Sequence, residues 1–430
     1  MPFKHLYEVA DSFCQEPENH KNLLFVESMG RLAFYDEEEG YHKFYTVREL
    51  DQMARRYIIK HLRKAVTKSS IRDFIFQVEI EVYRSTEKMK TEHVALNDVL
   101  LNIGTGETCE YEREKLVFHR LNITSTDMET EAPRFFQFLD EVIVRDDNTP
   151  DKELQKVVQE MFGFALLPGL DPHAVFFLVG SGANGKSVLL NLLIEIVGRD
   201  FVASSSIQSL TTGKFKFSGL IGKKLNICNE EESKYLRSDT FKALVSGDPI
   251  QDERKFGDKY TFYPNTKFLF ATNEWPSFDT INEGLRRRFK IIPFKRIIPT
   301  ELRDAGLFAE LKKELPGIIR WAIEGGRRLV ENGYQFSKSK AMKEALTTLE
   351  EEISSAIKFI RERYEEKEGA FIANSDLYTH YRLWCEENGR KPMNSTNFGK
   401  DLTKALLIQS EIRWQADDQR SERGRALILR

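Results

Sequence analysis

Apolar residues in the middle of the chain occur in short, nearly continuous runs. They read AVFFLV (174–179), LNIC (225–228), FLFAT (268–272) and FKIIPF (289–294), and each run is followed by glycine or a polar residue. Runs of about four to eight apolar residues between turn signals are typical of buried strands. SVLLNLLIEIVG (187–198) follows the first run and predicts a helix that ends at Gly198. The pattern favours an α/β core with a parallel sheet.

Longer stretches on both sides of this core have apolar residues at helical spacing. FFQFLDEVI (135–143) and KELQKVVQEMFGFALL (152–167) precede the first strand, and PGIIRWAIEGGRRLVENG (316–333) follows the last. The charge-rich segment 338–353 predicts a solvated helix that connects the core to the C-terminal part.

The first 90 residues or so mix strand and helix patterns. LLFVES (23–28), RLAFYDEE (31–38) and YHKFYTV (41–47) predict short strands, and segment 47–84 has apolar residues at helical spacing. VALNDVLLNIGTGE (94–107) predicts one strand that ends in a G-T-G turn. No catalytic constellation is visible here, so we expect a mixed α+β scaffold or docking domain.

The C-terminal stretch predicts a winged helix. EISSAIKFIRERY (352–364), LYTHYRLWCEENG (377–389) and NSTNFGKDLTKAL (394–406) are helical patterns, and the last two follow N-cap signals at Asn374-Ser375 and at Asn394 or Ser395. Two strands around a basic turn complete the unit in segment 411–430. Such a unit presents one helix and its hairpin to DNA in many proteins, and in others it serves only protein contacts.

Charge and cysteine content narrow the possible classes. Lys and Arg total 64 against 67 for Asp and Glu, a near balance that leaves room for local basic patches and therefore for nucleic acid. No apolar run approaches the roughly 18 residues of a membrane span, and the N-terminus has no signal-peptide core. The four cysteines form no C-x-x-C pair. We expect an intracellular protein with reduced thiols, without a membrane segment or a structural zinc site.

The clearest motif is GSGANGKS (180–187), which fits the phosphate-binding pattern G-x-x-x-x-G-K-S between a predicted strand and a predicted helix. Glycines let successive backbone N–H groups turn toward phosphate oxygens, and the helix adds its positive end. The lysine can reach the β- and γ-phosphates, and the serine hydroxyl can bind Mg²⁺. We therefore expect ATP and Mg²⁺ as cofactors, bound by Gly180, Gly182, Asn184, Gly185, Lys186 and Ser187.

Acidic and amide groups follow the next two predicted strands. Asn229, Glu230 and Glu231 come after LNIC, where phosphoryl transfer needs one group for the Mg²⁺ shell and one carboxylate to polarise water. Which glutamate is the base stays open. Asn273, at the end of FLFAT, can orient the attacking water.

Basic residues complete the pattern. Arg286, Arg287 and Arg288 precede the last strand, and one of them is a candidate arginine finger, because three adjacent arginines are costly to bury. Segment 247–264 predicts a β-hairpin inserted in the core. Its tip carries the candidate DNA-contacting residues Arg254, Lys255 and Lys259.

The order FFLVGSGANGKS, KKLNICNEE, SGDPIQDERKF, KFLFATNEWP, LRRRFKIIPF resembles the superfamily 3 helicases, specifically the phage, plasmid and poxvirus-type primase–helicase branch. The resemblance implies an AAA+-like ATPase that forms a hexameric ring on DNA. It extends to VALNDVLLNIGTGE with EAPRFFQFLDEV and to the C-terminal winged helix, and residues 1 to about 90 match least well.

Carried over by position, Lys186 and Ser187 are the Walker A pair and Glu230, with Glu231 beside it, supplies the Walker B acids. Asn273 is the sensor, and Arg287 or Arg288 is the finger acting in trans. Many members have an acid where this chain has Asn229, so the metal shell moves to Glu230 or includes water. The hairpin lysine of this pattern is Lys255.

The resemblance implies a helicase that replicates a mobile element, phage or virus in the host cytoplasm or at a viral replication site. It would move 3′ to 5′ on single-stranded DNA, and act on forked or origin DNA. Since no primase motif is visible, the chain is a stand-alone helicase or the helicase part of a longer protein with a primase or polymerase. We expect an N-terminal domain over 1–132, an ATPase domain over 133–335 and a winged helix over 336–430. The alternatives are an ATP-controlled origin-binding initiator and a non-translocating P-loop kinase.

Overall fold

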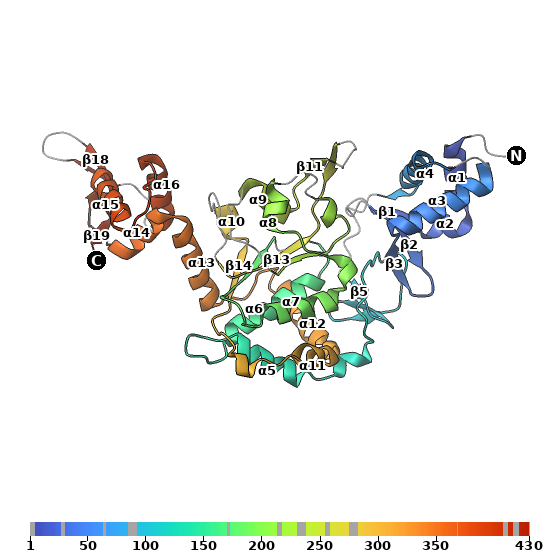
Figure 1. Cartoon of the computed structure of the whole chain (residues 1–430), viewed down its shortest axis with the longest axis horizontal. Helices are drawn as coiled ribbons and strands as arrows, with labels where there is room; N and C mark the ends of the chain where they lie inside the picture. Colours follow the sequence, from blue (N-terminus) through green and yellow to red (C-terminus); the bar gives the residue numbers. More distant parts are fainter. Residues whose placement is uncertain are drawn as a thin grey trace.

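The computed structural model describes residues 5–26, 31–62, 66–84, 93–169, 173–212, 217–229, 238–253, 259–274, 283–367, 369–406, 412–415 and 421–429. In Figure 1 a central α/β part lies between the N-terminal residues on the right and the C-terminal residues on the left. Across these ranges, every helix is too short or too polar to cross a membrane.

The N-terminal unit (residues 5–84) is a small α+β body with its own core. Its elements are α1 (Leu6–Gln15), α2 (Pro17–Asn22), β1 (Leu23–Val26), β2 (Arg31–Asp36), β3 (Tyr41–Phe44), α3 (Val47–Leu62), α4 (Lys68–Glu81) and β4 (Tyr83–Arg84). The sheet has the order β3-β2-β1-β4. Phe13, Phe74 and Val78 lie in a core that α1, α3 and α4 share. The strands and helices expected from the alternating and helical patterns are present.

Segment 93–129 corrects one expectation, since residues 94–107 do not form a single strand. They contain β5 (His93–Ala95) and β6 (Leu100–Asn102), which pair antiparallel, and β7 (Thr108–Cys109) follows. The Leu96 N–H donates to the Val99 carbonyl at 2.8 Å and closes a turn at Asn97-Asp98. These two residue types favour turns because their side chains hydrogen-bond nearby backbone.

The central unit is built on a five-stranded parallel sheet. The strands β8 (Val175–Val179), β9 (Val202–Ala203), β10 (Leu225–Cys228), β13 (Lys267–Thr272) and β14 (Phe289–Pro293) have the order β14-β8-β13-β10-β9. Its helices are α5 (Pro133–Val142), α6 (Lys152–Leu166), α7 (Lys186–Val197), α8 (Ile207–Thr212), α9 (Ser238–Ser246), α10 (Glu283–Arg286), α11 (Leu307–Lys313) and α12 (Leu315–Glu331). Short 3₁₀ turns lie at Thr126–Glu129, Arg199–Phe201, Ser218–Leu220 and Thr300–Leu302.

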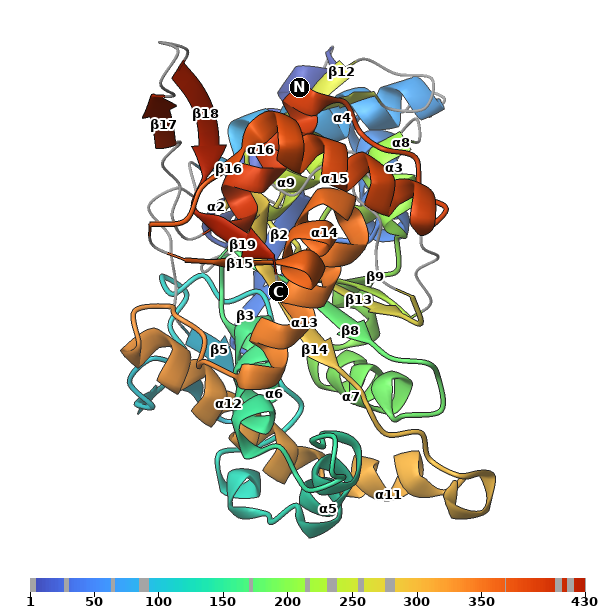
Figure 2. The same ribbon diagram turned by 90° about the vertical axis from the view of Figure 1, so that its left-hand side faces the viewer.

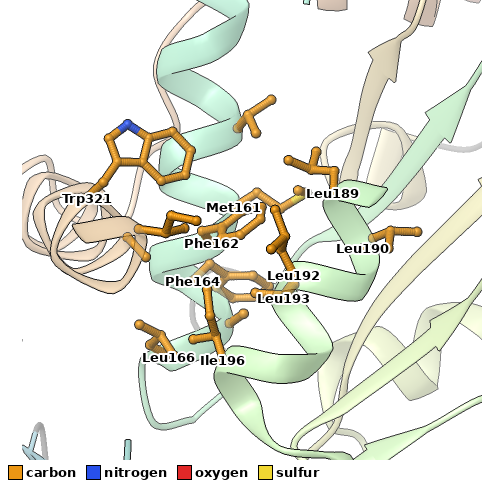
Figure 3. Packing of buried hydrophobic residues seen from close by; sticks show 14 of the residues in the cluster. Met161, Phe162, Phe164, Leu166, Leu189, Leu190, Leu192, Leu193, Ile196 and Trp321 are labelled. Atoms are coloured by element: carbon orange, nitrogen blue, oxygen red, sulfur yellow. The ribbon is translucent and has the colours of Figure 1, made fainter. Parts of the chain in front are cut away.

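Side chains from the two faces of β8 enter two different cores. Phe176 and Leu178 pack with residues of α5, α6, α7 and α12, whereas Val175, Phe177 and Val179 pack with residues of α8, α9 and the later helix α13 (Lys340–Ile353). Figure 3 shows the first core, where Phe162 and Phe164 of α6 meet leucines of α7 and Trp321 of α12. The sheet is thus buried on both faces, as the nearly continuous apolar runs predict.

Helices α6 and α12 cross at glycines. A Cβ at Gly163 would lie 2.0 Å from the Gly326 nitrogen, and one at Gly325 would lie 2.2 Å from the Gln159 carbonyl oxygen. Beside this crossing, the fully buried Glu160 carboxylate accepts from Arg328 Nε at 2.8 Å and from the Ser337 N–H at 2.7 Å. The crossing therefore holds α12 on the same face of the sheet as α6, the helix that precedes β8.

The C-terminal unit (residues 355–429) follows a long helix, α13 (Lys340–Ile353). It contains α14 (Ser355–Arg363), β15 (Tyr364–Glu366), β16 (Ile372–Ala373), α15 (Asn374–Glu387), α16 (Ser395–Ala405), β17 (Ile412–Gln415), β18 (Ser421–Arg425) and β19 (Leu427–Leu429). β17 and β18 pair antiparallel, and Asn394 caps α16 by accepting from the Asn397 N–H at 2.9 Å. The three helices and the hairpin lie where the sequence predicts them.

Helix α13 is only partly a solvated connection. Ala345 and Leu349 are buried in the core that the second face of the sheet forms with α8 and α9. The expectation of a solvated helix is therefore wrong for one face of α13. These apolar residues of α13 fall on that face and pack into the core beneath the sheet.

Candidate nucleotide and nucleic-acid site

The loop 180–185 connects strand β8 to helix α7 at the carboxyl edge of the sheet. Its backbone has left-handed φ angles at Gly182 (96°), Ala183 (47°) and Gly185 (89°). Gly185 directly precedes α7, and a Cβ on it would lie 2.7 Å from Val142 Cγ1 of α5. Only glycine fits this position, for both its φ and its close approach. The loop therefore curls tightly at the N-terminal end of a helix of twelve residues, the geometry that suits an anion.

Lys186 is held at the centre of this loop. Its side chain is 5 % exposed, and Nζ donates to the Gly180 carbonyl oxygen at 2.6 Å and to Asn184 Oδ1 at 3.1 Å. Burial lowers the pKa of the ammonium group, and no carboxylate pairs with it in the described part of the chain. A desolvated cation whose partners here are neutral oxygens fits an anionic ligand such as a phosphate.

The structure brings Asn273 to the same place. Asn273 directly follows β13, the neighbour of β8, and its Oδ1 lies 3.4 Å from Lys186 Nζ. Asn273 and Ser187 are both exposed, so both can face a ligand at this edge. The role that the sequence suggests for Asn273, orienting the attacking water as the sensor, stays a prediction.

Asn184 is a second buried polar residue of the loop. It is 3 % exposed, and its Nδ2 has no hydrogen-bond partner among the residues described. A Cβ on Gly180 would lie 2.4 Å from that nitrogen. The segment after β14 supports the loop from behind, because the Ile298 N–H donates to the Ala183 carbonyl at 2.8 Å.

The acidic residues predicted for the site lie outside the described residues. β10 ends at Cys228, Asn229 is exposed directly after it, and Glu230 and Glu231 lie outside the described residues. In the described ranges, no group of three His, Cys, Asp or Glu side chains is placed to hold a metal ion. The exposed Ser187, the second residue of α7 after the loop, is compatible with a Mg²⁺ ligand, and Glu230 as the second ligand stays a prediction.

The three adjacent arginines have three different environments. Arg286 Nε lies 2.5 Å from Glu350 Oε1 of α13, and Arg361 of α14 pairs with the other oxygen at 3.1 Å. Arg288 is 5 % exposed and donates to the Gly284 carbonyl and to Ser246 Oγ. Burial, together with the charge of Arg287, lowers its pKa. Arg287 is exposed, and its side chain has no ion pair or hydrogen bond with the described residues.

Sequence reasoning did not find Glu350, although it holds one of the candidate arginines. Glu350 and Arg286 are 64 residues apart, and a carboxylate in the charge-rich α13 has no local signal that distinguishes it from its neighbours Glu351 and Glu352. The finding removes Arg286 from the free cations of this cluster.

The hairpin is present with β11 (Ile250–Glu253) and β12 (Lys259–Phe262) in antiparallel register. Buried Asp252 anchors it, because its Oδ2 accepts from the Phe217 N–H at 3.0 Å. Arg254 and Lys255 lie outside the described residues. Lys259 pairs with Glu253 in the register, and nothing is described of its side chain.

Comparison with known proteins gives matches to both the central and the C-terminal unit. Residues 178–288 match a family of unknown function, DUF5906, and residues 330–426 match the family described as Poxvirus D5 protein-like. Each match covers about a quarter of the chain.

Two curated proteins match the chain over short lengths. The chain is 29% identical over 182 residues to a protein named “Putative helicase” of Acanthamoeba polyphaga mimivirus, covering 40% of this chain and 18% of that protein. It is 41% identical over 46 residues to Transcription factor RFX4 of Mus musculus, covering 11% of this chain and 6% of that protein. The chain thus spans less than a fifth of the length of these curated relatives.

One solved structure covers nearly the whole chain. The apo structure of the NrS-1 C-terminal region superposes with a TM-score of 0.50 at 13% identity, over 98% of both chains. At this identity the likeness concerns the fold alone, a mixed α/β architecture with a parallel sheet.

Proposed function

This chain is a relative of the superfamily 3 primase–helicases of the phage and poxvirus type, and on that premise we propose that it is an ATP-dependent DNA helicase acting in replication. The observation that carries the proposal is the position of Lys186. A desolvated ammonium group lies inside a curled glycine loop at a helix N-terminus, 3.4 Å from a polar side chain of the neighbouring strand. This arrangement suits ATP phosphates.

The loop binds the nucleotide in this proposal. Backbone N–H groups of Asn184 and Gly185 face phosphate oxygens. The Gly182 N–H, which donates to the Gly180 carbonyl at 2.9 Å, and Lys186 both exchange their present oxygen partners for phosphate oxygens. Ser187 and Glu230 would hold Mg²⁺, which when bound would supply positive charge to the phosphates. Glu230 or Glu231 takes a proton from the attacking water, and Asn273 orients that water.

The finger in this proposal is Arg287. Of the three adjacent arginines, Arg286 is paired with Glu350 and Arg288 is buried in hydrogen bonds, whereas Arg287 is exposed and unpaired among the described residues. An exposed, unpaired guanidinium group can reach the nucleotide of a neighbouring subunit. This supports action in trans within a homo-oligomeric ring, for which we propose a hexamer.

DNA contacts come from two elements in this proposal. Arg254, Lys255 and Lys259 on the hairpin contact single-stranded DNA in the channel of the ring, and hydrolysis moves the hairpins 3′ to 5′. The C-terminal unit acts as a winged helix on forked or origin DNA. The domain limits 1–132, 133–335 and 336–430, a primase or polymerase partner, and a cytoplasmic or viral replication site remain part of the proposal.

The test is ATP hydrolysis with and without single-stranded DNA, followed by strand displacement on a fork. We expect Lys186→Met to lower DNA-stimulated hydrolysis by at least about a hundredfold, because the variant loses the charge that stabilises the phosphates. Lys223→Met is the matched control, since Lys223 donates to the Asp200 carbonyl away from the loop. Wild-type turnover in Lys186→Met contradicts the nucleotide site.

The same assays separate the alternatives. Hydrolysis that DNA does not stimulate favours a kinase-like enzyme. DNA-stimulated hydrolysis without strand displacement favours an initiator whose ATPase controls only assembly.

A further inference from the structure

Helix α3 of the N-terminal unit has an exposed basic face, defined by Arg48, Gln52, Arg56 and Lys60. All four side chains are exposed, and they follow one another at intervals of four residues. Each interval rises about 6 Å along a helix and turns by only about 40°, so these residues form one continuous stripe. Lys and Arg outnumber Asp and Glu by eight to two between residues 46 and 72, in a chain whose formal net charge is −3.

The two acidic residues of α3 are already engaged. Glu49 Oε2 accepts from the Thr46 N–H at 2.7 Å, in a reciprocal cap with Thr46 Oγ1, and these bonds hold the pKa of Glu49 below its usual value. Asp51 pairs with Arg55 at 2.9 Å. Arg48, Arg56 and Lys60 have no carboxylate partner among the described residues. Glu49 keeps its negative charge, because its hydrogen-bond partners are neutral groups of Thr46. One carboxylate beside three cations still leaves this face with a net positive charge.

A groove runs along the same face. It has a volume of about 380 Å³ and is lined by Glu49, Gln52, Met53, Arg56, Tyr57 and Lys60. The Tyr57 ring lines it and is held by the hydrogen bond from its hydroxyl to Glu16 Oε1 at 2.8 Å. The ammonium group of Lys60 lies over that ring, with Nζ 5.8 Å from its centre. The ring thus gives the cation of Lys60 an ordered neighbour that leaves its charge available.

The position of α3 relates this face to the hairpin. Figures 1 and 2 both show α3 and α4 in the same upper part of the molecule as the β11–β12 hairpin. Helices α7, α11 and α12 lie lower in the central unit, so helix α3 and the hairpin are both at the upper end of the molecule in this view.

From these observations we propose that the basic face of α3 is a second DNA-contacting surface, which binds backbone phosphates of the strand engaged by the hairpin. The proposal rests on the proposed function, and it adds a site in the N-terminal unit. A stripe of unpaired cations fits the regularly spaced charges of a nucleic-acid backbone, and contacts of this kind position DNA without reading its sequence.

The experiment measures binding of a labelled forked DNA by fluorescence anisotropy over a range of salt concentrations. In Arg56→Ala/Lys60→Ala we expect binding about tenfold weaker near 0.1 M salt. The slope of log K against log salt should fall by about 1.8 if the contacts are to duplex and about 1.4 if they are to a single strand. Arg56→Glu/Lys60→Glu should weaken binding further.

Three controls keep the result specific. Arg56→Lys/Lys60→Arg keeps both charges and should bind as the wild type. Lys313→Glu/Lys338→Glu reverses two exposed charges outside the N-terminal unit and should also bind normally. ATP hydrolysis without DNA should be unchanged in every variant, which shows that the ATPase core is intact.

The failures of this inference and of the proposed function differ. Unchanged affinity and salt slope in both the alanine and the glutamate variants overturn the inference and leave the helicase intact. Loss of binding in the charge-keeping variant, or equal loss in the control, overturns it as well, because charge on α3 is then not the cause. A wild-type chain that neither binds DNA nor hydrolyses ATP in response to it overturns both.

Discussion

Replacing the neighbouring arginines one at a time separates a catalytic role from a structural one. Arg287 is exposed and unpaired among the described residues, whereas Arg288 is 5 % exposed and donates to Gly284 and, at 2.8 Å, to Ser246 Oγ. Arg287→Ala should therefore impair the reaction and leave the fold intact. Arg288→Ala should destabilise the fold first, because it releases the end of α9 from the turn that follows α10.

The expected magnitudes follow from these contacts. Hydrogen bonds from a charged donor contribute about 1.5–3 kcal/mol each, and part of this is offset because the buried guanidinium of Arg288 is desolvated. We expect Arg288→Ala to lower the free energy of unfolding by about 2–3 kcal/mol. Arg287→Ala should change it by less than about 0.5 kcal/mol, as is usual for an exposed residue without partners. Its hydrolysis rate should fall by about a thousandfold, equivalent to about 4 kcal/mol in the transition state.

The assay combines urea unfolding with steady-state ATP hydrolysis, and it ends with mixing. Arg287→Ala should bind ATP normally, and mixing it with Lys186→Ala should restore part of the activity, since some interfaces then pair an intact loop with an intact finger. If unwinding requires ATP hydrolysis at every site of a ring, mixed rings would not regain unwinding. ATP hydrolysis is therefore measured first. The reasoning fails if Arg287→Ala hydrolyses ATP at the wild-type rate, or if stably folded Arg288→Ala is the inactive variant.

Three further predictions concern the acids, a helix crossing and a buried histidine. Glu230→Gln should bind ATP and hydrolyse it poorly, because the amide cannot take a proton; an active Glu230→Gln beside an inactive Glu231→Gln assigns the base to Glu231. Gly163→Ala should lower the free energy of unfolding by about 3 kcal/mol or more, since its Cβ would lie 2.0 Å from the Gly326 nitrogen. Gly399→Ala in α16, whose Cβ would have no atom within 4 Å, should be neutral or stabilising. Equal stability of the two variants contradicts the close approach of α6 and α12. Burial lowers the pKa of His42 to about 4, so below about pH 6.5 the unfolded chain takes up a proton at this residue and the folded chain does not. His42 should therefore lower the free energy of unfolding by up to about 3 kcal/mol as the pH drops from 6.5 toward 4. A His42→Asn variant that keeps the wild-type pH dependence in urea unfolding refutes this.

The sequence by itself determined the local elements of the nucleotide site. β8, the glycine loop and α7 follow one another within 25 residues, and their pattern depends on near neighbours: apolar side chains for the buried strand, glycines for positive φ, and leucines at helical spacing. The hairpin and the three C-terminal helices were predictable for the same reason. The one strand predicted over 94–107 was wrong because the turn residues Asn97 and Asp98 were overlooked inside an apolar run.

Only the tertiary structure decided which of these residues meet. Lys186 and Asn273 are 87 residues apart and come together because β8 and β13 are adjacent in the sheet, an order that the chain's sequence pattern does not specify. The sequence offers no signal that distinguishes the three adjacent arginines. In the structure, Glu350 of α13 pairs with Arg286, and Arg288 is buried and donates to Ser246 of α9, whereas Arg287 is exposed. Local patterns set helices, strands and loops through contacts within a few residues, whereas burial and ion pairing depend on partners that packing brings from elsewhere in the chain.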